Sequence, residues 1–207
     1  MDEFFPTLPG MKTDALQITE EGMYSVTKPR DATQIIEFMQ SVIKEPLNEL
    51  VMLDGTANCG GDTIHCSQVF KRIVAIEKNP DTCEVLRKNV FEAYRLTNVE
   101  VRCADTIQEW STFRDDMDIL YLDAPWGGRN YRKHSNLDLF LGSTRLDHFV
   151  NSVITGAIHN KPKYICMKLP FNYNWERIHD MKRRFPHIET HFTGVANYEV
   201  VVISLGF

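Results

Sequence analysis

Acidic and aromatic side chains follow short apolar runs at four places in the 207-residue chain, a pattern typical of loops that line a ligand site. The first loop reads LDGTANCGGDTI and holds two carboxylates, Asp54 and Asp62, among three glycines. Glycine lets a backbone approach a ligand closely, and carboxylates suit a cationic ligand better than the polyphosphate that a bare helix N-terminus attracts. The sequence therefore predicts a loop that binds a cationic group, with an ordinary glycine turn as the alternative.

Two further acids follow the next apolar runs. Glu77 comes directly after RIVAI, where its carboxylate could accept hydrogen bonds from both hydroxyls of a ribose. Asp105 follows VEVRCA and could accept a hydrogen bond from the amino group of adenine, or instead cap a helix. A cationic amino acid, a ribose and an adenine are the parts of S-adenosylmethionine, so the three loops together indicate that cofactor.

The fourth loop, DILYLDAPWGGRNY, carries the most specific signal. An amine attached to a nucleobase ring is a poor nucleophile, so an enzyme must aim its lone pair at the methyl group. Asp123 and a backbone carbonyl of this turn could accept its two N–H hydrogens, and Trp126 could stack on the base. A tryptophan can also fill a core, but APW and GG at the end of a strand favour a functional Trp126.

Apolar periodicity predicts the elements that position these loops. We expect strands at 50–54, 72–77, 99–103, 118–123 and 164–169, and helices at 29–44, from about residue 62, and at 80–94, 145–159 and 174–184. Thr27 is the expected N-cap of the first helix. Two last strand-like runs, 187–194 and 198–205, are close enough in sequence to form an antiparallel hairpin.

This order of elements predicts a Rossmann-like α/β fold, with a mostly parallel seven-stranded sheet, a C-terminal antiparallel hairpin and helices on both faces. Ligands bind such sheets beyond the carboxyl ends of the strands, where the four loops would meet. By analogy of fold, a terminal hairpin distinguishes class I methyltransferases from dehydrogenases. We expect an N-terminal arm, 1–28, that packs over the cofactor and substrate site, followed by one methyltransferase domain, 29–207.

Composition and charge exclude several classes of protein. Hydrophobic residues make up 43% and charged residues 25% of the chain, as in soluble globular proteins. No apolar run is long enough to span a membrane and the first residues lack a signal-peptide pattern, so a soluble, intracellular protein is expected. The net charge of −5 favours a small or terminal nucleotide over long nucleic acid, with basic clusters at 129–134 and 182–184 available for a few phosphates.

The cysteines and histidines indicate no other chemistry. The cysteines are odd in number, scattered and without a CxxC pattern, which predicts reduced, mostly buried thiols rather than disulfides or a zinc site. They are Cys59, Cys66, Cys83, Cys103 and Cys166. The seven histidines show no paired metal-ligand spacing and no nucleophile elbow is present, so we assign no metal and no covalent nucleophile.

Four segments, VMLDGTANCGGDTI, IVAIEKNP, LYLDAPWGGRNY and ITEEGMYSVTKP, together resemble trimethylguanosine synthases, the RNA cap guanine-N2 methyltransferases. The corresponding family patterns are an acid with FCGxGGNTI, AIDxDP, SPPWGGPDY and a segment like GxxFSVTPE. The resemblance runs in order from about Leu16 to Tyr131 and fades toward the C-terminus. It implies methyl transfer from S-adenosyl-L-methionine to N2 of a 7-methylguanosine cap, with capped RNA or a cap-like nucleotide as the partner of a monomer.

The resemblance also implies residue roles. Asp54 and Gly60 would line the methionine end of the cofactor, and Trp126 would stack on the methylated guanine. The expected cofactor-binding residues are Ser25, Val26, Thr27, Asp54, Gly55, Thr56, Gly60, Thr63, Glu77, Lys78, Ala104, Asp105 and Asp123. The expected substrate-binding residues are Trp126, Gly127, Arg129, Asn130 and Tyr131, and the expected catalytic residues are Asp123, Pro125 and Trp126.

Three positions depart from the family pattern. Asp123 stands where the family has serine, Ala124 where it has proline, and Met23 where an aromatic residue is usual. Asp123 is similar instead to the DPPW loop of adenine-N6 methyltransferases, which keeps adenine in RNA or DNA as an alternative target. A cofactor-binding scaffold without catalysis is a third alternative, although the intact acids and PWGG turn disfavour it. If guanine is the target, Asp123→Ser should retain methylation.

Overall fold

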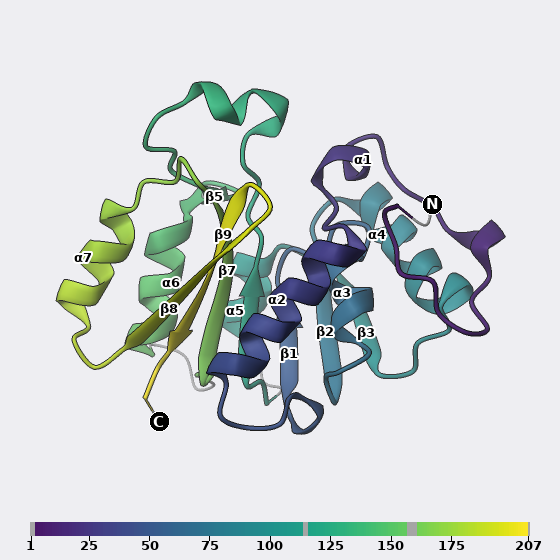
Figure 1. Ribbon diagram of the computed structural model, residues 1–207, viewed down its shortest axis with the longest axis horizontal. Helices are drawn as coiled ribbons and strands as arrows, with labels where there is room; N and C mark the ends of the chain where they lie inside the picture. The colour runs from purple at the N-terminus through teal and green to yellow at the C-terminus, as the bar shows by residue number, and fades with distance from the viewer. Residues whose placement is uncertain (1–2, 114–115, 157–160, 207) are drawn as a thin grey trace.

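One large sheet organises the molecule, which a computed structural model describes over residues 3–113, 116–156 and 161–206 (Figure 1). Its parallel strands, in order across the sheet, are β3 (Val99–Cys103), β2 (Arg72–Glu77), β1 (Val51–Asp54), β4 (Ile119–Leu122) and β7 (Tyr164–Pro170). β9 (Tyr198–Ser204) pairs antiparallel with β7, and β8 (Glu189–Val195) forms the far edge. The predicted seven-stranded sheet with its C-terminal hairpin is confirmed.

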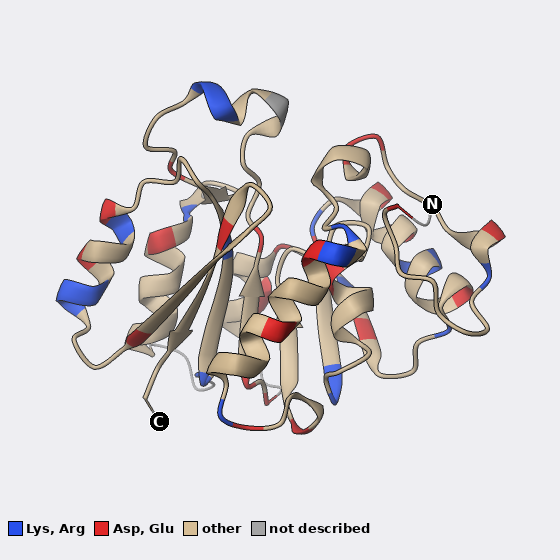
Figure 2. Ribbon diagram, in the orientation of Figure 1, with Lys and Arg blue, Asp and Glu red and all other residues tan. Residues whose placement is uncertain are grey.

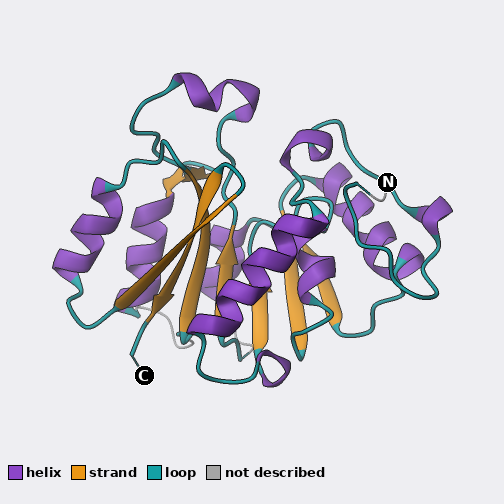
Figure 3. Cartoon of the chain, viewed as in Figure 1, coloured by secondary structure: helices purple, strands orange, loops and turns teal. Residues whose placement is uncertain are grey.

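Helices cover both faces of the sheet because successive residues of a strand point to opposite sides (Figure 3). On the face that carries Met52 and Ile73 lie α2 (Pro29–Val42), α3 (Gly61–Cys66) and α4 (Pro80–Arg87). On the face that carries Leu53 and Val74 lie α5 (Thr106–Thr112), α6 (Leu146–Thr155) and α7 (Glu176–Arg184). The apolar side chains of each layer form a buried core that holds the strand ends in place.

Shorter elements connect these layers, and the sequence patterns did not predict them. They are η1 (Thr13–Ala15), α1 (Gly22–Ser25), η2 (Leu47–Glu49), η3 (Lys88–Ala93), η4 (Gly128–Lys133) and the paired strands β5 (Phe140–Leu141) and β6 (Thr144–Arg145). η3 is a π-helical turn that ends the helix predicted at 80–94. The helix predicted at 145–159 ends as α6 at Thr155, and residues 157–160 lie outside the described part of the chain.

The predicted N-cap of α2 is wrong. The helix begins at Pro29 after Lys28, and no side chain caps it. Proline suits this place because its fixed φ is helical and it lacks the N–H that a cap would satisfy. The hydroxyl of Thr27 donates instead to Asp62 at 2.6 Å, so it joins the arm to α3.

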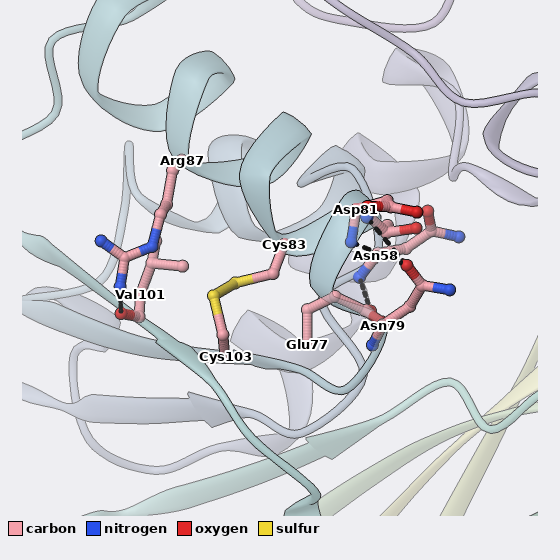
Figure 4. Close-up of a disulfide and its surroundings, with 9 residues drawn as sticks. Asn58, Glu77, Asn79, Asp81, Cys83, Arg87, Val101 and Cys103 are labelled. Carbon is pink, nitrogen blue, oxygen red and sulfur yellow. Dashed lines mark hydrogen bonds between the residues drawn. A yellow bond between two sulfur atoms is a disulfide. The ribbon is translucent and has the colours of Figure 1, made fainter.

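The expectation that all five cysteines are reduced is also wrong. Cys83 on α4 and Cys103 at the end of β3 form a disulfide, with their Cα atoms 5.6 Å apart (Figure 4). The connection from α4 to β3 folds back over the sheet and brings together residues 20 positions apart, which sequence spacing does not reveal. Cys59, Cys66 and Cys166 are free and buried, as predicted.

The N-terminal segment is fastened to the core on the α3 and η3 side. Phe5 and Leu16 are buried in a small apolar cluster with residues of α3 and η3. Asn89 accepts a hydrogen bond from the amide of Gln17 and donates to the carbonyls of Gln17 and Cys59, each at 2.8 Å. These bonds hold the segment before α2 against the first loop. Among the described helices, none is both long and apolar enough to traverse a bilayer.

Candidate active site

A cavity of about 870 Å³ lies at the carboxyl ends of the parallel strands. Its walls come from the loops after β1, β2, β3 and β4, from residues 21–28 of the arm, from the β5–β6 hairpin and from the turn between β8 and β9. Parallel strands end at one edge of a sheet, so the four predicted loops meet there. In Figure 1, α1 and the segment that contains η4 rise on opposite sides of this edge.

Asp54 lies beneath the cavity rather than in its wall. Its side chain is 1% exposed and accepts hydrogen bonds from the Thr63 hydroxyl at 2.6 Å and the Thr56 amide at 3.2 Å. Burial, reinforced by the nearby carboxylate of Asp62, raises the pKa of Asp54 to about 7. Asp54 therefore shapes the first loop, and Asp62 is the acid of that loop that faces the cavity.

Two glycines fix how the first loop enters α3. Gly60 has a φ of 98°, a left-handed conformation that glycine adopts without strain. A side chain on Gly61 would collide with Val26 and the backbone of Thr27. The sequence suggested that glycine lets a ligand approach this loop closely. At Gly61, it is the arm that approaches the backbone closely.

Glu77 stands at the end of β2 with both carboxylate oxygens engaged by backbone. One oxygen accepts from the amide of Asn58 at 2.9 Å and the other from the amide of Asn79 at 2.7 Å. Burial raises the pKa of Glu77 against the lowering effect of these hydrogen bonds. Each carboxylate oxygen can accept a second bond, so the group remains suited to a pair of ribose hydroxyls.

Asp105 has the helix-capping role that its position suggested, and it also lies in the cavity wall. It caps α5, accepting from the amide of Ile107 at 2.9 Å, and its second oxygen lies 2.6 Å from the ammonium of Lys78. Burial acts to raise the pKa of Asp105, but the hydrogen bonds from Lys78 and the α5 amides lower it overall. The carboxylate is therefore an ionised acceptor at the cavity wall.

Asp123 follows β4 and belongs to a buried polar chain. Its amide donates to the Thr56 hydroxyl at 2.7 Å, and its Oδ2 accepts from the ammonium of Lys168 at 2.7 Å. Lys168 also donates to Thr27 at 2.8 Å, and Thr27 donates to Asp62. Burial raises the pKa of Asp123, and the Lys168 ammonium opposes that rise. The chain links the arm, α3, β4 and β7 around one corner of the cavity.

Trp126 lies half-buried in an aromatic corner. The centre of its ring is 5.0 Å from that of Tyr131 and 5.8 Å from that of Tyr198, both edge to face. Asn197, in the turn between β8 and β9, donates to the Tyr131 hydroxyl at 2.9 Å. Trp126 also packs on both core layers, so it is part of the wall as well as a surface for stacking.

The structure gathers most of the predicted site residues around the cavity. Those in its wall are Ser25, Val26, Thr27, Gly55, Thr56, Glu77, Lys78, Asp105, Asp123, Pro125, Trp126 and Tyr131. Six further described residues lie in the same loops but outside the wall, namely Asp54, Gly60, Thr63, Ala104, Gly127 and Asn130. The side chain of Arg129 lies outside the described part of the structure.

Sequence reasoning did not assign several residues of the wall to the site, among them Asp31, Lys168, Asn197 and Tyr198. Lys168 left a readable signal, because it is a charged residue inside the apolar run YICMKLP. Asn197 and Tyr198 left no such signal, since only the antiparallel pairing of β9 with β7 brings the hairpin turn to this edge of the sheet. The described residues hold no group of three or more His, Cys, Asp or Glu side chains that could bind a metal ion.

Comparison with known families decides what kind of site this is. A family model described as RNA cap guanine-N2 methyltransferase matches residues 49–201, from just before β1 into β9. The chain belongs to the RNA cap guanine-N2 methyltransferase family. It is therefore a methyltransferase, and S-adenosylmethionine is its methyl donor.

Relatives of this cap methyltransferase family member are distant. The chain is 23% identical to uncharacterized protein L320 of Acanthamoeba polyphaga mimivirus over an alignment of 202 residues. That alignment covers 87% of this chain and 77% of the relative. The chain is 23% identical over 175 residues to the trimethylguanosine synthase of Schizosaccharomyces pombe, spanning 72% and 71%.

Solved methyltransferases share the fold at low identity. Precorrin-6y C5,15-methyltransferase of Geobacter metallireducens aligns with a TM-score of 0.62 and 16% identity, over 97% of this chain and 98% of that one. The 16S rRNA N2 G1207 methyltransferase of T. thermophilus, solved with AdoMet and guanosine, aligns with a TM-score of 0.63 and 18% identity, over 87% and 44%.

The carboxylate acceptors of the cavity fit the methyl donor of this methyltransferase. Glu77 suits its ribose, and the carboxylates of Asp62 and Asp123 suit its positive charges. The cavity, of about 870 Å³, lies in the range of sites that enclose small ligands.

Proposed function

We propose that this protein transfers a methyl group to the N2 amine of a guanosine in an RNA cap. The observation that supports this proposal most strongly is the position of Asp123 and Trp126, which lie together in the cavity wall at the end of β4. One can accept a hydrogen bond from an amine, and the other can stack on the base that carries it.

Each loop binds a different part of the methyl donor. Glu77 binds the ribose hydroxyls, Asp105 accepts from the adenine amino group, and Lys78 stays beside Asp105 at that end. The first loop holds the methionine end, and residues 25–27 of the arm close the pocket over it. When bound, S-adenosylmethionine supplies an electrophilic methyl group on a positively charged sulfur.

The residues after β4 then aim the target amine. Its nitrogen forms a bond with the methyl carbon as the carbon–sulfur bond breaks, and that electron pair stays on sulfur. The methylated nitrogen releases one proton, which Asp123 accepts through its hydrogen bond to the amine. Pro125 fixes the turn, because proline restricts both its own φ and the residue before it. Catalysis rests mainly on this positioning.

The base and its phosphates lie toward η4. A 7-methylguanine carries a positive charge, which favours stacking on the indole of Trp126 beside Tyr131. Gly127, Arg129 and Asn130 belong to the turn that follows. Figure 2 shows basic residues on the projecting η4 segment, where Arg132 and Lys133 end the helical turn. They suit a few phosphates of a cap better than a long strand.

A methyl-transfer panel tests the proposal. Purified protein and radiolabelled S-adenosylmethionine are offered a guanosine cap analogue, a 7-methylguanosine cap analogue, adenine-containing RNA and DNA in parallel. The proposal expects label on the cap analogues, and Asp123→Ala, which removes the amine acceptor, should lose it. Label on adenine but not on either cap analogue would replace guanine-N2 by adenine-N6, the target that an acid at the head of DAPW also suits. Tight cofactor binding without transfer to any of the four would favour a scaffold.

A further inference from the structure

Lys168 is a buried cation that has no part in the steps of the proposed reaction. It is 3% exposed and lies on β7, a strand that is buried along its whole length. An ammonium group away from water is unfavourable unless it is paired and hydrogen-bonded. Lys168 meets that condition with the Asp123 carboxylate at 2.7 Å and the Thr27 hydroxyl at 2.8 Å.

The partners of Lys168 are themselves site residues. Asp123 begins the DAPW turn, and Thr27 lies in the arm that closes the pocket. The Thr27 hydroxyl in turn donates a hydrogen bond to Asp62 at the start of α3. The ammonium therefore fixes two parts of the cavity wall directly, through Asp123 and Thr27, and a third, Asp62, through Thr27.

We propose that Lys168 is a positioning residue for methyl transfer, whose ammonium holds the Asp123 carboxylate ionised and oriented toward the target amine. This inference rests on the proposed function for the identity of the reaction. It assigns Lys168 no contact with the substrate; the residue acts through Asp123.

Charge around the pair explains why Asp123 needs this partner. The charged and titratable groups that neighbouring elements bring to the pair are Asp31 on α2, Asp54 on β1, Asp62 on α3, Tyr121 on β4 and Tyr198 on β9. Burial and, after it, the Asp62 carboxylate favour the protonated form of Asp123, and Lys168 opposes them. A protonated carboxyl donates through its O–H and loses acceptor capacity.

Lys168 itself keeps its charge in this setting. Burial acts to lower its pKa, but the carboxylates of Asp123 and Asp62 outweigh burial and raise it. The lysine is therefore an ammonium whenever the carboxylates are ionised. In Lys168→Met, Asp123 would lose its cationic partner while the Asp62 carboxylate stays nearby, so the pKa of Asp123 would rise further.

The pair also changes the expectation for Asp123→Ser. The family pattern has serine at this position, so the sequence alone suggested that the substitution is tolerated. In this structure, serine would leave the Lys168 ammonium buried without its carboxylate, which is strongly unfavourable. Asp123→Ser/Lys168→Met removes both charges together. We expect the double variant to fold better and turn over faster than Asp123→Ser alone.

The first test is the pH profile of methyl transfer to the cap analogue. Lys168→Met should lower kcat by roughly ten-fold or more at neutral pH, with KM nearly unchanged, because the charge-assisted hydrogen bonds of Asp123 are weakened. The acid limb of its profile should move to higher pH, so alkaline pH restores part of the rate. Lys168→Arg keeps the charge and should shift that limb far less. An equal loss of kcat at every pH would overturn the proposal.

The second test needs no activity. Carbon-13 spectra of aspartate-labelled protein without ligand report the titration of Asp123, assigned with Asp123→Asn. The proposal expects this titration to move to higher pH in Lys168→Met, and an unmoved titration contradicts it. If the wild type methylates no cap substrate yet the Asp123 titration moves, the proposed function fails while the pairing stands. If Lys168→Met does not fold, Lys168→Gln, which keeps a hydrogen-bond donor but has no charge, takes its place in both tests, and an unmoved Asp123 titration in that variant contradicts the proposal.

Discussion

At the scale of single residues, the site depends on carboxylates whose surroundings differ. Asp105 is held ionised by Lys78 and the α5 amides, Asp123 is paired with Lys168, and Asp54 is buried against two neutral donors. The same type of side chain is thus available as an acceptor in the cavity wall at two places, and at the third it holds the first loop together from within. Each role leads to a different measurable consequence.

Glu77 should carry much of the affinity for the methyl donor. Glu77→Ala removes the acceptor for two ribose hydroxyls, and charge-assisted hydrogen bonds of this kind contribute about 1.5–3 kcal/mol. Calorimetric titration should therefore show cofactor binding weakened by roughly ten-fold or more. Glu77→Gln, which keeps one acceptor oxygen for the Asn58 or Asn79 amide, controls for damage to the loops. Unchanged affinity in both variants would contradict the assignment.

Trp126 should act on substrate rather than on cofactor. Trp126→Ala loses a stacking surface, which is worth about 1–3 kcal/mol per base, so KM for the cap analogue should rise about ten-fold or more. Trp126→Phe keeps a smaller ring and should be affected less. Cofactor affinity, followed by calorimetry, should hardly move. A loss of folding in Trp126→Ala, with no selective effect on substrate in Trp126→Phe, would identify the ring as core only.

Asp54 should make stability depend on pH. Its pKa in the folded protein is about 7, above the ordinary value of 3.8, so its contribution to stability is fully present below the ordinary value and is lost as pH rises toward 7. The free energy of unfolding of the wild type, taken relative to Asp54→Asn, should therefore fall over that range. The fall should be at most a few kcal/mol, at about 1.4 kcal/mol per unit of pKa difference. Urea unfolding at several pH values measures it, and a constant difference would contradict the effect.

At the scale of elements, the sequence predicted the strands well because short apolar runs between helices have few other structures available. The strand ends placed Glu77, Asp105 and Asp123 at one edge before any contact was known. The contact of Lys168 with Asp123 could not be predicted from the sequence, since it depends on β4 and β7 being neighbours in the sheet. Nor could the Cys83–Cys103 bond, which depends on how α4 lies over β3.

The disulfide joins α4 to the end of β3, close in sequence to two acids of the cavity wall, Glu77 and Asp105. Cys83 lies one turn into α4, which follows Glu77 (Figure 4), and Cys103 comes two residues before Asp105 in the sequence. Closing a loop of this length stabilises a protein by about 3 kcal/mol in the chain-entropy account. A reductant should therefore lower the thermal midpoint of the wild type and leave Cys83→Ala/Cys103→Ala unmoved. Calorimetry with and without reductant measures this, and equal midpoints in the wild type would contradict it.

At the scale of the whole molecule, one sheet edge gathers the loops, the arm and the hairpin turn around a single cavity. The net charge of −5 leaves η4 as a local basic segment near that cavity rather than part of a broad basic surface. This distribution suits an enzyme that binds one end of an RNA through its base and a few phosphates. Membership of the cap methyltransferase family agrees with that arrangement.

The most direct measurement is the identity of the methylated atom. RNA with a 7-methylguanosine cap is incubated with the protein and S-adenosylmethionine, digested to nucleosides and analysed by mass spectrometry against synthetic standards. The account predicts a guanosine methylated at both N7 and N2, which is absent when Asp123→Ala replaces the wild type. A new N6-methyladenosine peak, with the cap guanosine unchanged, would contradict it.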